Sequence, residues 1–385
     1  MQIYLDITRL LKGRFFGQRP TGIDRVSLAY VRNYSHTALA VLCVHGFYIA
    51  LSARESAHAF QLLLAQDCSR NSVARLILRS VLTVWPRRQL KDGILLHTSH
   101  SGGESDRYFR GLRRRNVGLA FMVHDLIPLT HAEYCRAGIA QVHEERVRTA
   151  LKYSGGIIAN SQATLDSLLG YASRARLPLP KTVVARLAPA MSRGNVASRP
   201  IDTPYFVMLG TIEPRKNHWL ILHVWRRLVE QLGKAAPKLV VIGRRGWECE
   251  NVLDMLERCT SIQGSVIEEM DCSDERLHTW LRHAQALVFP SFAEGYGIPI
   301  AEALAERVPV LASDLSVFRE FAGDIPDYLD PLDGPAWFAR ILAYARPDSP
   351  ERKAQLARIE RFREPTWAEH FENVDRLLNA LKSPA

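Results

Sequence analysis

The sequence predicts an α/β protein with two Rossmann-like domains, and three observations support this fold class. The chain has 385 residues, which is more than one ordinary hydrophobic core accommodates. Short runs rich in Val, Ile and Leu alternate with stretches of helical periodicity. These runs form two sets, and between them the segment 187–204 is rich in Pro, Ser and Gly and weak in periodicity. Continuously apolar strands are typical of parallel sheets that helices cover on both faces.

The expected strands can be placed in chain order. Those of the first set are 1–7, 38–44, 93–98, 118–124 and 155–161. Those of the second set are 205–210, 238–243, 286–291 and 308–313. A helix is expected at 218–233, and an amphipathic helix at 365–382 near the end of the chain. We therefore expect an N-terminal domain at 1–195 and a C-terminal domain at 196–364.

Composition narrows the class of protein. Hydrophobic residues make up 47% of the chain and charged residues 23%, which is typical of globular proteins. No apolar run reaches the length of about 18 residues that a membrane-spanning helix needs. The start "MQIYLDITRL" resembles a strand and not a signal peptide. The six cysteines lack C-x-x-C spacing, which favours reduced thiols. We therefore expect a cytoplasmic protein.

The net charge of +10 favours an anionic partner. Nucleic acid, acidic lipid and a phosphorylated substrate all satisfy this criterion. The basic clusters at 75–90 and 107–116 contain no zinc-finger or RNA-recognition signature, so we expect no nucleic-acid partner. Charge alone does not choose between the remaining partners.

Chemistry-bearing residues gather in "PSFAEGYGIPIAEALAERVPVLAS" at 290–313. The segment contains the end of a strand, a glycine-bearing turn, a helix with proline near its start, and the next strand. Ligands of open α/β sheets bind at the carboxyl ends of strands, where this turn lies. A helix start favours phosphate, and Glu302 about one turn into that helix can accept from ribose hydroxyls. The alternative is that Glu294 and Glu302 are surface acids that stabilise a helix N-terminus.

A second turn, "GTIEPRKN" at 210–217, also follows a strand and precedes a helix. Arg215 and Lys216 are adjacent there, and Asn217 is a candidate helix cap. An arginine fork beside a lysine point charge suits a diphosphate. A solvated surface pair is the alternative for these two residues when the turn is considered alone.

Together, "GTIEPRKN" and "EGYGIPIAEA" at 294–303 resemble family 4 of the retaining glycosyltransferases. Three further stretches are similar to N-terminal landmarks of that family and occur in the same order: "TGIDRV" at 21–26, "FMVHDLIPL" at 121–129 and "IIANSQAT" at 157–164. The resemblance implies the GT-B fold, with two Rossmann-like domains that face each other across a cleft. It also implies that 365–385 is a crossover helix belonging to the N-terminal acceptor domain, whereas 196–364 is the donor domain.

The resemblance assigns donor-binding roles in the C-terminal domain. Arg215 and Lys216 neutralise the donor diphosphate. Glu294 contacts sugar hydroxyls beside the reacting carbon, and Glu302 holds the ribose. Backbone amides complete the pocket around three residues of the turn, namely Gly295, Tyr296 and Gly297.

In the N-terminal domain the resemblance assigns three residues. Gly22 lets the backbone pass close to the diphosphate, His124 lines the reaction centre, and Asp125 is an acceptor-side group. A core or capping role is the alternative for His124. Asp24 and Arg25 have two interpretations, a local ion pair or acceptor contact. Asn160 and Ser161 are expected to end a strand and cap a helix, with a substrate role as the alternative.

The reaction expected from these residues needs no metal and no cofactor. The chain contains no D-x-D sequence, so Arg215, Lys216 and a helix N-terminus must meet the charge of the leaving group. No carboxylate nucleophile is securely placed, so we assign no double displacement. The alternative from another class is a non-catalytic protein that binds nucleotide sugars or polyanions. A donor hydrolase or phosphorylase also stays open, whereas a dinucleotide-binding oxidoreductase lacks its G-x-G-x-x-G fingerprint here.

The branch of the family that the sequence resembles builds bacterial surface polysaccharide such as lipopolysaccharide. This implies a mannosyltransferase-like enzyme that uses a GDP-sugar in preference to a UDP-sugar, with a lipid-linked or oligosaccharide acceptor. The segment 72–91 has two interpretations. Its apolar residues and basic flanks suit a helix lying peripherally on the inner face of the anionic cytoplasmic membrane, or an ordinary packed helix. The apolar residues are Val73, Leu76, Ile77, Val81, Leu82 and Trp85.

Overall fold

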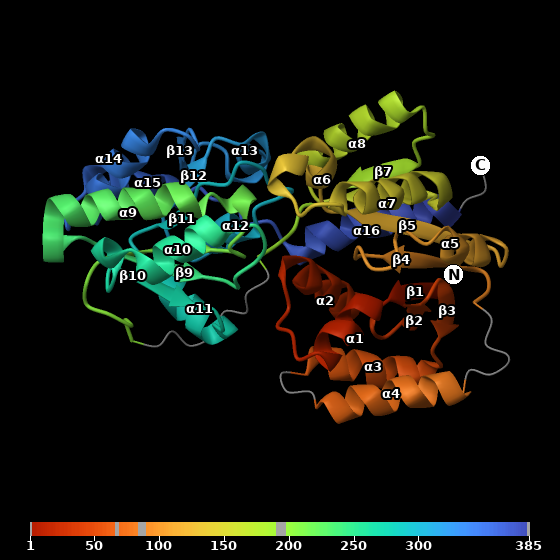
Figure 1. Cartoon of the computed structure of the whole chain (residues 1–385). Helices are drawn as coiled ribbons and strands as arrows, with labels where there is room; N and C mark the ends of the chain where they lie inside the picture. Colours follow the sequence, from red (N-terminus) through yellow and green to blue (C-terminus); the bar gives the residue numbers. More distant parts are fainter. Residues whose placement is uncertain (1, 66–68, 84–89, 190–197, 383–385) are drawn as a thin grey trace. The chain divides into compact units, whose positions relative to one another are not determined.

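The computed structural model describes residues 2–65, 69–83, 90–189 and 198–382 (Figure 1). The chain divides into two compact units, each with its own sheet and core. The first contains Met1–Leu129, Gly138–Ala190 and Thr366–Ala385, and the second contains Thr130–Ala137 and Met191–Pro365. The end of the chain thus belongs to the first unit, and an eight-residue piece from the N-terminal half belongs to the second.

The sheet of the first unit has the strand order β3-β2-β1-β4-β5-β6-β7. Its strands are β1 (Gln2–Asp6), β2 (Ala38–Val44), β3 (Phe47–Ala50), β4 (Gly93–His97), β5 (Val117–Val123), β6 (Gly156–Ala159) and β7 (Lys181–Val184). Among these described strands only β3 is antiparallel, because a turn at His45 and Gly46, both with positive φ, returns it along β2. The strand order reverses between β1 and β4, so the loops after these strands border a switch point.

Helices cover this sheet, and its core is aromatic and aliphatic. They are α1 (Thr8–Phe15), α2 (Gly22–Tyr34), α3 (Ala53–Leu64), α4 (Arg70–Thr83), α5 (Asp106–Arg113), α6 (Ile127–Thr130), α7 (Ile139–Tyr153), α8 (Gln162–Ala175) and α16 (Trp367–Lys382). One core cluster holds Tyr108, Phe109 and Leu95 between α5 and the strands. Fully buried aromatic rings of this kind dominate the hydrophobic stabilisation of a sheet.

Helix α16 is fixed to the first unit by packing and by hydrogen bonds. It packs on β6 and β7, where the absence of a side chain at Gly156 leaves room for Leu377 and Leu381. The imidazole of His370 is buried, and its Nδ1 donates to the carbonyls of Ala185 and Arg186 at 3.1 and 3.0 Å. Its Nε2 accepts from the Tyr30 hydroxyl at 2.9 Å. Burial lowers the pKa of His370 to about 4, so the ring is neutral in the folded protein.

The second unit is built on a parallel sheet with strand order β10-β9-β8-β11-β12-β13. Its strands are β8 (Tyr205–Leu209), β9 (Lys238–Ile242), β10 (Val266–Glu269), β11 (Leu287–Phe289), β12 (Val310–Ser313) and β13 (Asp327–Leu329). Its helices are α9 (His218–Leu232), α10 (Glu250–Arg258), α11 (Asp274–Arg282), α12 (Ile298–Ala305), α13 (Ser316–Ala322), α14 (Gly334–Ala345) and α15 (Pro350–Ile359). The core centres on the fully buried rings of Phe206, Trp225 and Trp337.

These two sheets confirm the prediction of an α/β protein with two Rossmann-like parts and a C-terminal helix. The segment 72–91 is only partly described. Val73 and Leu76 are buried, and α4 packs on α1 and α3, so these two side chains are not available to a membrane interface. Trp85, Arg87 and Arg88 lie outside the described residues, as do the side chains of Val81 and Leu82. Within the part of the chain that is described, no helix is both long and apolar enough to span a membrane.

Candidate active site

Two loops of the second unit meet where its strand order reverses. Strands β8 and β11 are neighbours, with β9 beyond one and β12 beyond the other. The loop 210–217 follows β8, and the loop 290–297 follows β11. The backbone N–H of Phe292 donates to the carbonyl of Arg215 at 2.9 Å, which ties one loop to the other. A topological switch point of this type is where open α/β sheets bind ligands.

Four charged side chains converge between these loops. Arg215 Nη1 lies 2.8 Å from Glu294 Oε2, and Lys216 Nζ lies 2.5 Å from Glu294 Oε1. Arg215 Nη2 donates to Glu213 Oε1 at 2.5 Å, while Nη1 donates to the Ala293 carbonyl at 2.7 Å. The structure thus brings together Arg215, Lys216 and Glu294, which the sequence analysis singled out. It adds Glu213, which that analysis left unassigned.

This charged cluster is largely removed from solvent. The side chains of Glu294 and Lys216 are 8% and 10% exposed. Burial by itself would raise the pKa of Glu294, but the charges of Arg215 and Lys216 outweigh it and lower that pKa to about 2. Burial also lowers the pKa of Lys216, although Glu294 opposes the shift. The low pKa keeps Glu294 ionised at neutral pH, in contact with both cations.

Lys216 reaches the cluster across the end of β8. Gly210 has φ +142°, and a Cβ there would lie 3.2 Å from Lys216 Cε, so a larger residue would crowd the lysine stem. The ammonium lies 4.5 Å from the centre of the Phe289 ring, a cation–π contact. Asn217 occupies the N-cap position of α9, as expected, but its side chain donates to the Pro331 carbonyl and not to the helix. Asn217 therefore holds the predicted cap position without a hydrogen bond from its side chain to the helix.

The loop 290–297 leads directly into α12. Gly297 has φ +99°, and a Cβ there would lie 2.7 Å from Phe318, so both the backbone and the packing require glycine. The Tyr296 ring stacks on Phe321, with ring centroids 4.8 Å apart. Glu302 lies within the first turns of α12 and is buried. Gly295 lies between Glu294 and Tyr296 in the same loop, so these predicted positions adjoin the charged cluster.

The remaining predicted residues belong to the first unit. Gly22 is the first residue of α2, behind a capping box of Thr21 and Asp24. Asp24 also pairs with Arg9 at 2.7 Å. The ion pair at this helix start thus joins Asp24 to Arg9, whereas the sequence analysis considered Arg25. Ser161 caps α8 by accepting from the Thr164 backbone, as expected for "IIANSQAT".

His124 directly follows β5 and is anchored at both its ring and its backbone. Its Nε2 lies 2.9 Å from the Thr98 carbonyl, so this nitrogen carries the proton. Its own carbonyl accepts from Asn160 Nδ2 at 2.8 Å. Burial lowers the pKa of His124. The Asp125 carboxylate accepts from the backbone N–H of Ile127 at 3.0 Å, so Asp125 also fixes the turn into α6.

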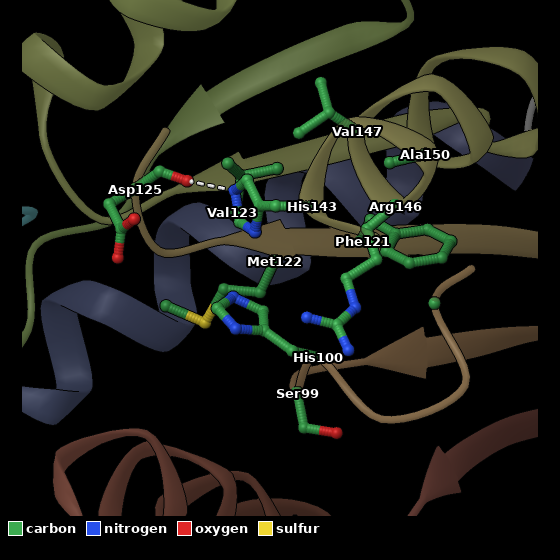
Figure 2. A pocket seen from close by; sticks show the side chains of 11 residues that line it. Ser99, His100, Phe121, Met122, Val123, Asp125, His143, Arg146, Val147 and Ala150 are labelled. Atoms are coloured by element: carbon green, nitrogen blue, oxygen red, sulfur yellow. Dashed lines mark hydrogen bonds between the residues drawn. The ribbon is translucent and has the colours of Figure 1, made fainter. Parts of the chain in front are cut away.

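A small cavity lies beside His124 in the first unit. It encloses about 20 Å³, which is room for one or two water molecules, and it is lined in part by Ser99, His100, Asp125, His143 and Arg146. Figure 2 shows His100 and Arg146 close together, with the ring of His143 held by the Asp125 carbonyl. The His100 ring is 5.4 Å from both the His124 and the His143 rings. Burial lowers the pKa of His100 and of His143, which favours the neutral form of both rings.

Three groups of residues around these sites were missed from the sequence. Glu213 stands two positions before Arg215 in "GTIEPRKN", and an acid so close to a proposed phosphate clamp was the available signal. Asn160 was interpreted as a cap, and no local pattern indicates its bond to His124. The ring contacts of His100 and His143 depend on tertiary packing, which spacing along the chain does not encode. Within the described residues, no group of His, Cys, Asp and Glu is arranged to hold a metal ion.

Parts of this chain are similar to known glycosyltransferases. Residues 195–325 match the family described as glycosyl transferases group 1. The serotype-specific mannosyltransferase WbdA of Escherichia coli is 26% identical over 251 residues, which is 60% of this chain and 31% of WbdA. O-antigen chain mannosyltransferase B of Escherichia coli is 33% identical over 163 residues, 42% of either chain. The matches thus span about a third to two fifths of these curated relatives.

Solved structures support the fold. HepE from Anabaena, crystallised with UDP-glucose, superposes over 100% of each chain with a TM-score of 0.66 and 15% identity. Sucrose-phosphate synthase from Thermosynechococcus elongatus gives a TM-score of 0.63 at 15% identity, over 99% of each chain. At this level of identity the likeness concerns the fold alone, and that fold is GT-B.

Proposed function

We propose that this chain is a retaining group 1 glycosyltransferase that transfers a hexose from a nucleotide sugar to a saccharide. Residues 195–325 match that family, and bacterial O-antigen mannosyltransferases are distant relatives of the chain. The observation that supports this most directly is the convergence of Arg215, Lys216 and Glu294 between the loops after β8 and β11. Two cations and a carboxylate at a switch point match the diphosphate and the sugar hydroxyls of such a donor.

In this proposal the charges act on the leaving group. Arg215 and Lys216 stabilise the negative charge that develops on the departing diphosphate, together with the amide groups at the start of α12. Glu294 accepts from hydroxyls of the transferred sugar, and Glu302 accepts from the ribose. The departing phosphate takes the proton of the acceptor hydroxyl, so attack occurs on the face that the leaving group vacates and the configuration is retained.

The first unit supplies the acceptor side in this proposal. His124 lines the reaction centre, Asp125 contacts the acceptor, and Gly22 allows close approach of the backbone to the diphosphate. Two hydrogen bonds support the role of His124, because they hold its ring and backbone in one orientation. Asn160 donates to the His124 carbonyl, and His124 Nε2 donates to the Thr98 carbonyl. The acceptor is a glycan or a lipid-linked saccharide of a bacterial surface polysaccharide.

We further propose that the donor is GDP-mannose. The relation to mannosyltransferases favours GDP-mannose, whereas HepE was crystallised with UDP-glucose. Titration calorimetry of the protein with GDP and with UDP separates these two choices. We expect tighter binding of GDP, and preferential binding of UDP would contradict the mannose assignment.

Turnover is the test of the reaction itself. With a nucleotide sugar and a saccharide acceptor, the wild type should form product, whereas Arg215→Ala and Glu294→Ala should lose at least about a hundredfold in rate. Both variants are checked for folding by circular dichroism. Activity should survive excess EDTA, since the cations of Arg215 and Lys216 replace a metal. Binding of the nucleotide sugar without turnover of any acceptor would favour the alternative, a non-catalytic binding protein.

A further inference from the structure

The carboxylate of Glu294 already occupies the two cations that the proposed donor needs. Its Oε2 pairs with Arg215 and its Oε1 with Lys216, at 2.8 and 2.5 Å. We propose that Glu294 is an internal competitor of the diphosphate, which holds Arg215 and Lys216 until the nucleotide sugar arrives and returns to them after transfer. This inference rests on the proposed function and adds to it a step that promotes product release.

The first argument is the balance of charge. Two cations, Arg215 and Lys216, face two carboxylates, Glu213 and Glu294, and the exposed fractions of these four side chains lie between 5% and 18%. A diphosphate brings further negative charge into the same poorly hydrated place. Like charges repel strongly there, so Arg215 and Lys216 cannot fully neutralise the carboxylates and the diphosphate at the same time. One carboxylate must therefore yield when the nucleotide binds.

The second argument identifies Glu294 as the carboxylate that yields. Arg215 is also held by Glu213 and by the Ala293 carbonyl, so it keeps its orientation when Glu294 leaves. Lys216 is in contact with Glu294 and with the face of the Phe289 ring, and the lysine stem is long enough to turn toward a phosphate. Glu294 also lies in the 290–297 loop beside two glycines, whereas Glu213 lies directly before the η2 turn (Pro214–Lys216).

The third argument concerns what Glu294 gains on release. In the proposed complex with a nucleotide sugar, its carboxylate accepts from sugar hydroxyls, which compensates for the lost ion pairs. A nucleoside diphosphate alone carries no sugar and offers no such compensation. Glu294 therefore weakens the binding of the product, the nucleoside diphosphate, more than the binding of the donor. After transfer, its return to Arg215 and Lys216 weakens the hold on the nucleoside diphosphate, which favours product release.

The test compares affinities for the product and for the donor. Calorimetry measures the affinities of the wild type and of Glu294→Gln for GDP, UDP, GDP-mannose and UDP-glucose. The comparison then uses the nucleotide that binds to the wild type. Glutamine keeps the shape and the hydrogen-bonding oxygen but removes the charge. We expect Glu294→Gln to bind the nucleoside diphosphate about tenfold tighter or more. The nucleotide sugar should gain less or lose affinity, so the preference for donor over product should fall.

Glu213→Gln is the matched control, because it removes the same charge from the same cluster. A general electrostatic effect would tighten the nucleoside diphosphate more than the nucleotide sugar, and to a similar extent in both variants, because the terminal phosphate of the free diphosphate carries more negative charge. The proposal requires the preference for donor over product to fall clearly further in Glu294→Gln than in Glu213→Gln. If Glu294→Gln is too unstable to titrate, Glu294→Asp replaces it, since a side chain one methylene shorter cannot reach both cations and should shift the preference in the same direction.

The outcomes separate this inference from the proposed function. An unchanged or weaker affinity of Glu294→Gln for the nucleoside diphosphate overturns the inference, because Glu294 would then be a permanent part of the clamp. The proposed function survives that result. If the wild type binds neither GDP nor UDP, the proposed function fails first and the inference fails with it. Stopped-flow release of the nucleoside diphosphate, slower from Glu294→Gln than from the wild type, would support the return step.

Discussion

Acid should weaken the first unit through the buried imidazole of His370. In the folded protein Nδ1 donates to two backbone carbonyls and Nε2 accepts from Tyr30, so the neutral ring with its proton on Nδ1 satisfies every partner. A second proton on Nε2 would face the Tyr30 oxygen in a place that water does not reach. In the unfolded chain the His370 ring has no such restriction and keeps its ordinary pKa. The unfolded state therefore binds the second proton more tightly than the folded state does.

The size of the effect follows from the two pKa values. The pKa of His370 is about 4 in the folded protein and 6.5 for an ordinary histidine. The contribution of His370 to stability should therefore be constant well above pH 6.5 and should fall as the pH drops from 6.5 toward 4. The loss reaches about 2 kcal/mol at pH 5 and about 3 kcal/mol below pH 4, because one pKa unit corresponds to about 1.4 kcal/mol.

The assay compares the wild type with His370→Gln in urea unfolding at pH 7.5 and at pH 5, conditions chosen about one unit or more from 6.5. Glutamine can donate to the carbonyls and accept from Tyr30, but it does not titrate. We expect the wild type to lose about 2 kcal/mol more than the variant between the two pH values. His100, His124 and His143 also have lowered pKa values, and their contribution is the same in both proteins. Equal losses in the two proteins would refute the reasoning.

Three further predictions concern the sites and the surface. Asn160→Ala should lower kcat about tenfold with a smaller change in KM, since it removes the donor to the His124 carbonyl; an equal change in both constants would contradict a positioning role. Gly297→Ala should lower the melting temperature more than Gly323→Ala, because both have positive φ but only the first would collide with Phe318. In vesicle flotation, binding of the protein to anionic vesicles should be lost at high salt. It should also be lost when glutamine replaces four arginines, because each arginine contributes about 1 kcal/mol of attraction to the anionic surface. A wild type that stays unbound at low salt would end the peripheral-membrane interpretation. The four are Arg75, Arg79, Arg87 and Arg88.

The central strands could be predicted because they are buried on both faces and therefore apolar throughout. Strands β1, β2, β4, β5, β6, β8, β9, β11 and β12 lie within about a residue or two of the predicted runs. The missed strands β3, β7, β10 and β13 lie at or next to sheet edges. Strand β10 has the sequence "VIEE", and β13 has "DYL". Their apolar runs are too short to stand out, because edge strands are stabilised by pairing with a neighbour and less by burial.

The candidate site was predictable where its residues lie in the turns that follow two adjacent strands. Arg215, Lys216 and Glu294 follow two adjacent strands, so strand assignment alone brings them to one edge of the sheet. The sequence did not reveal that Glu294 pairs with both cations, because the direction of a loop side chain depends on tertiary packing. Nor did it reveal the hydrogen bond from the Asn160 side chain to the backbone carbonyl of His124, which joins two different strand ends.

The exchange of segments between the two units limits how this chain can be recombined with its relatives. The backbone passes from one unit to the other at 129–130, 137–138, 190–191 and 365–366. Within the second unit, Tyr134 stacks on Phe292, with ring centroids 4.8 Å apart and ring planes 4° from parallel, directly beside the loop that carries Glu294. A chimera joined at a single point near residue 195 would combine Tyr134 from one parent with Phe292 from the other, and His370 with a foreign Tyr30. A chimera that keeps both units intact must transfer 130–137 with the second half and 366–382 with the first. During ribosomal synthesis the first unit cannot be completed until α16 has emerged, after the second unit has been made.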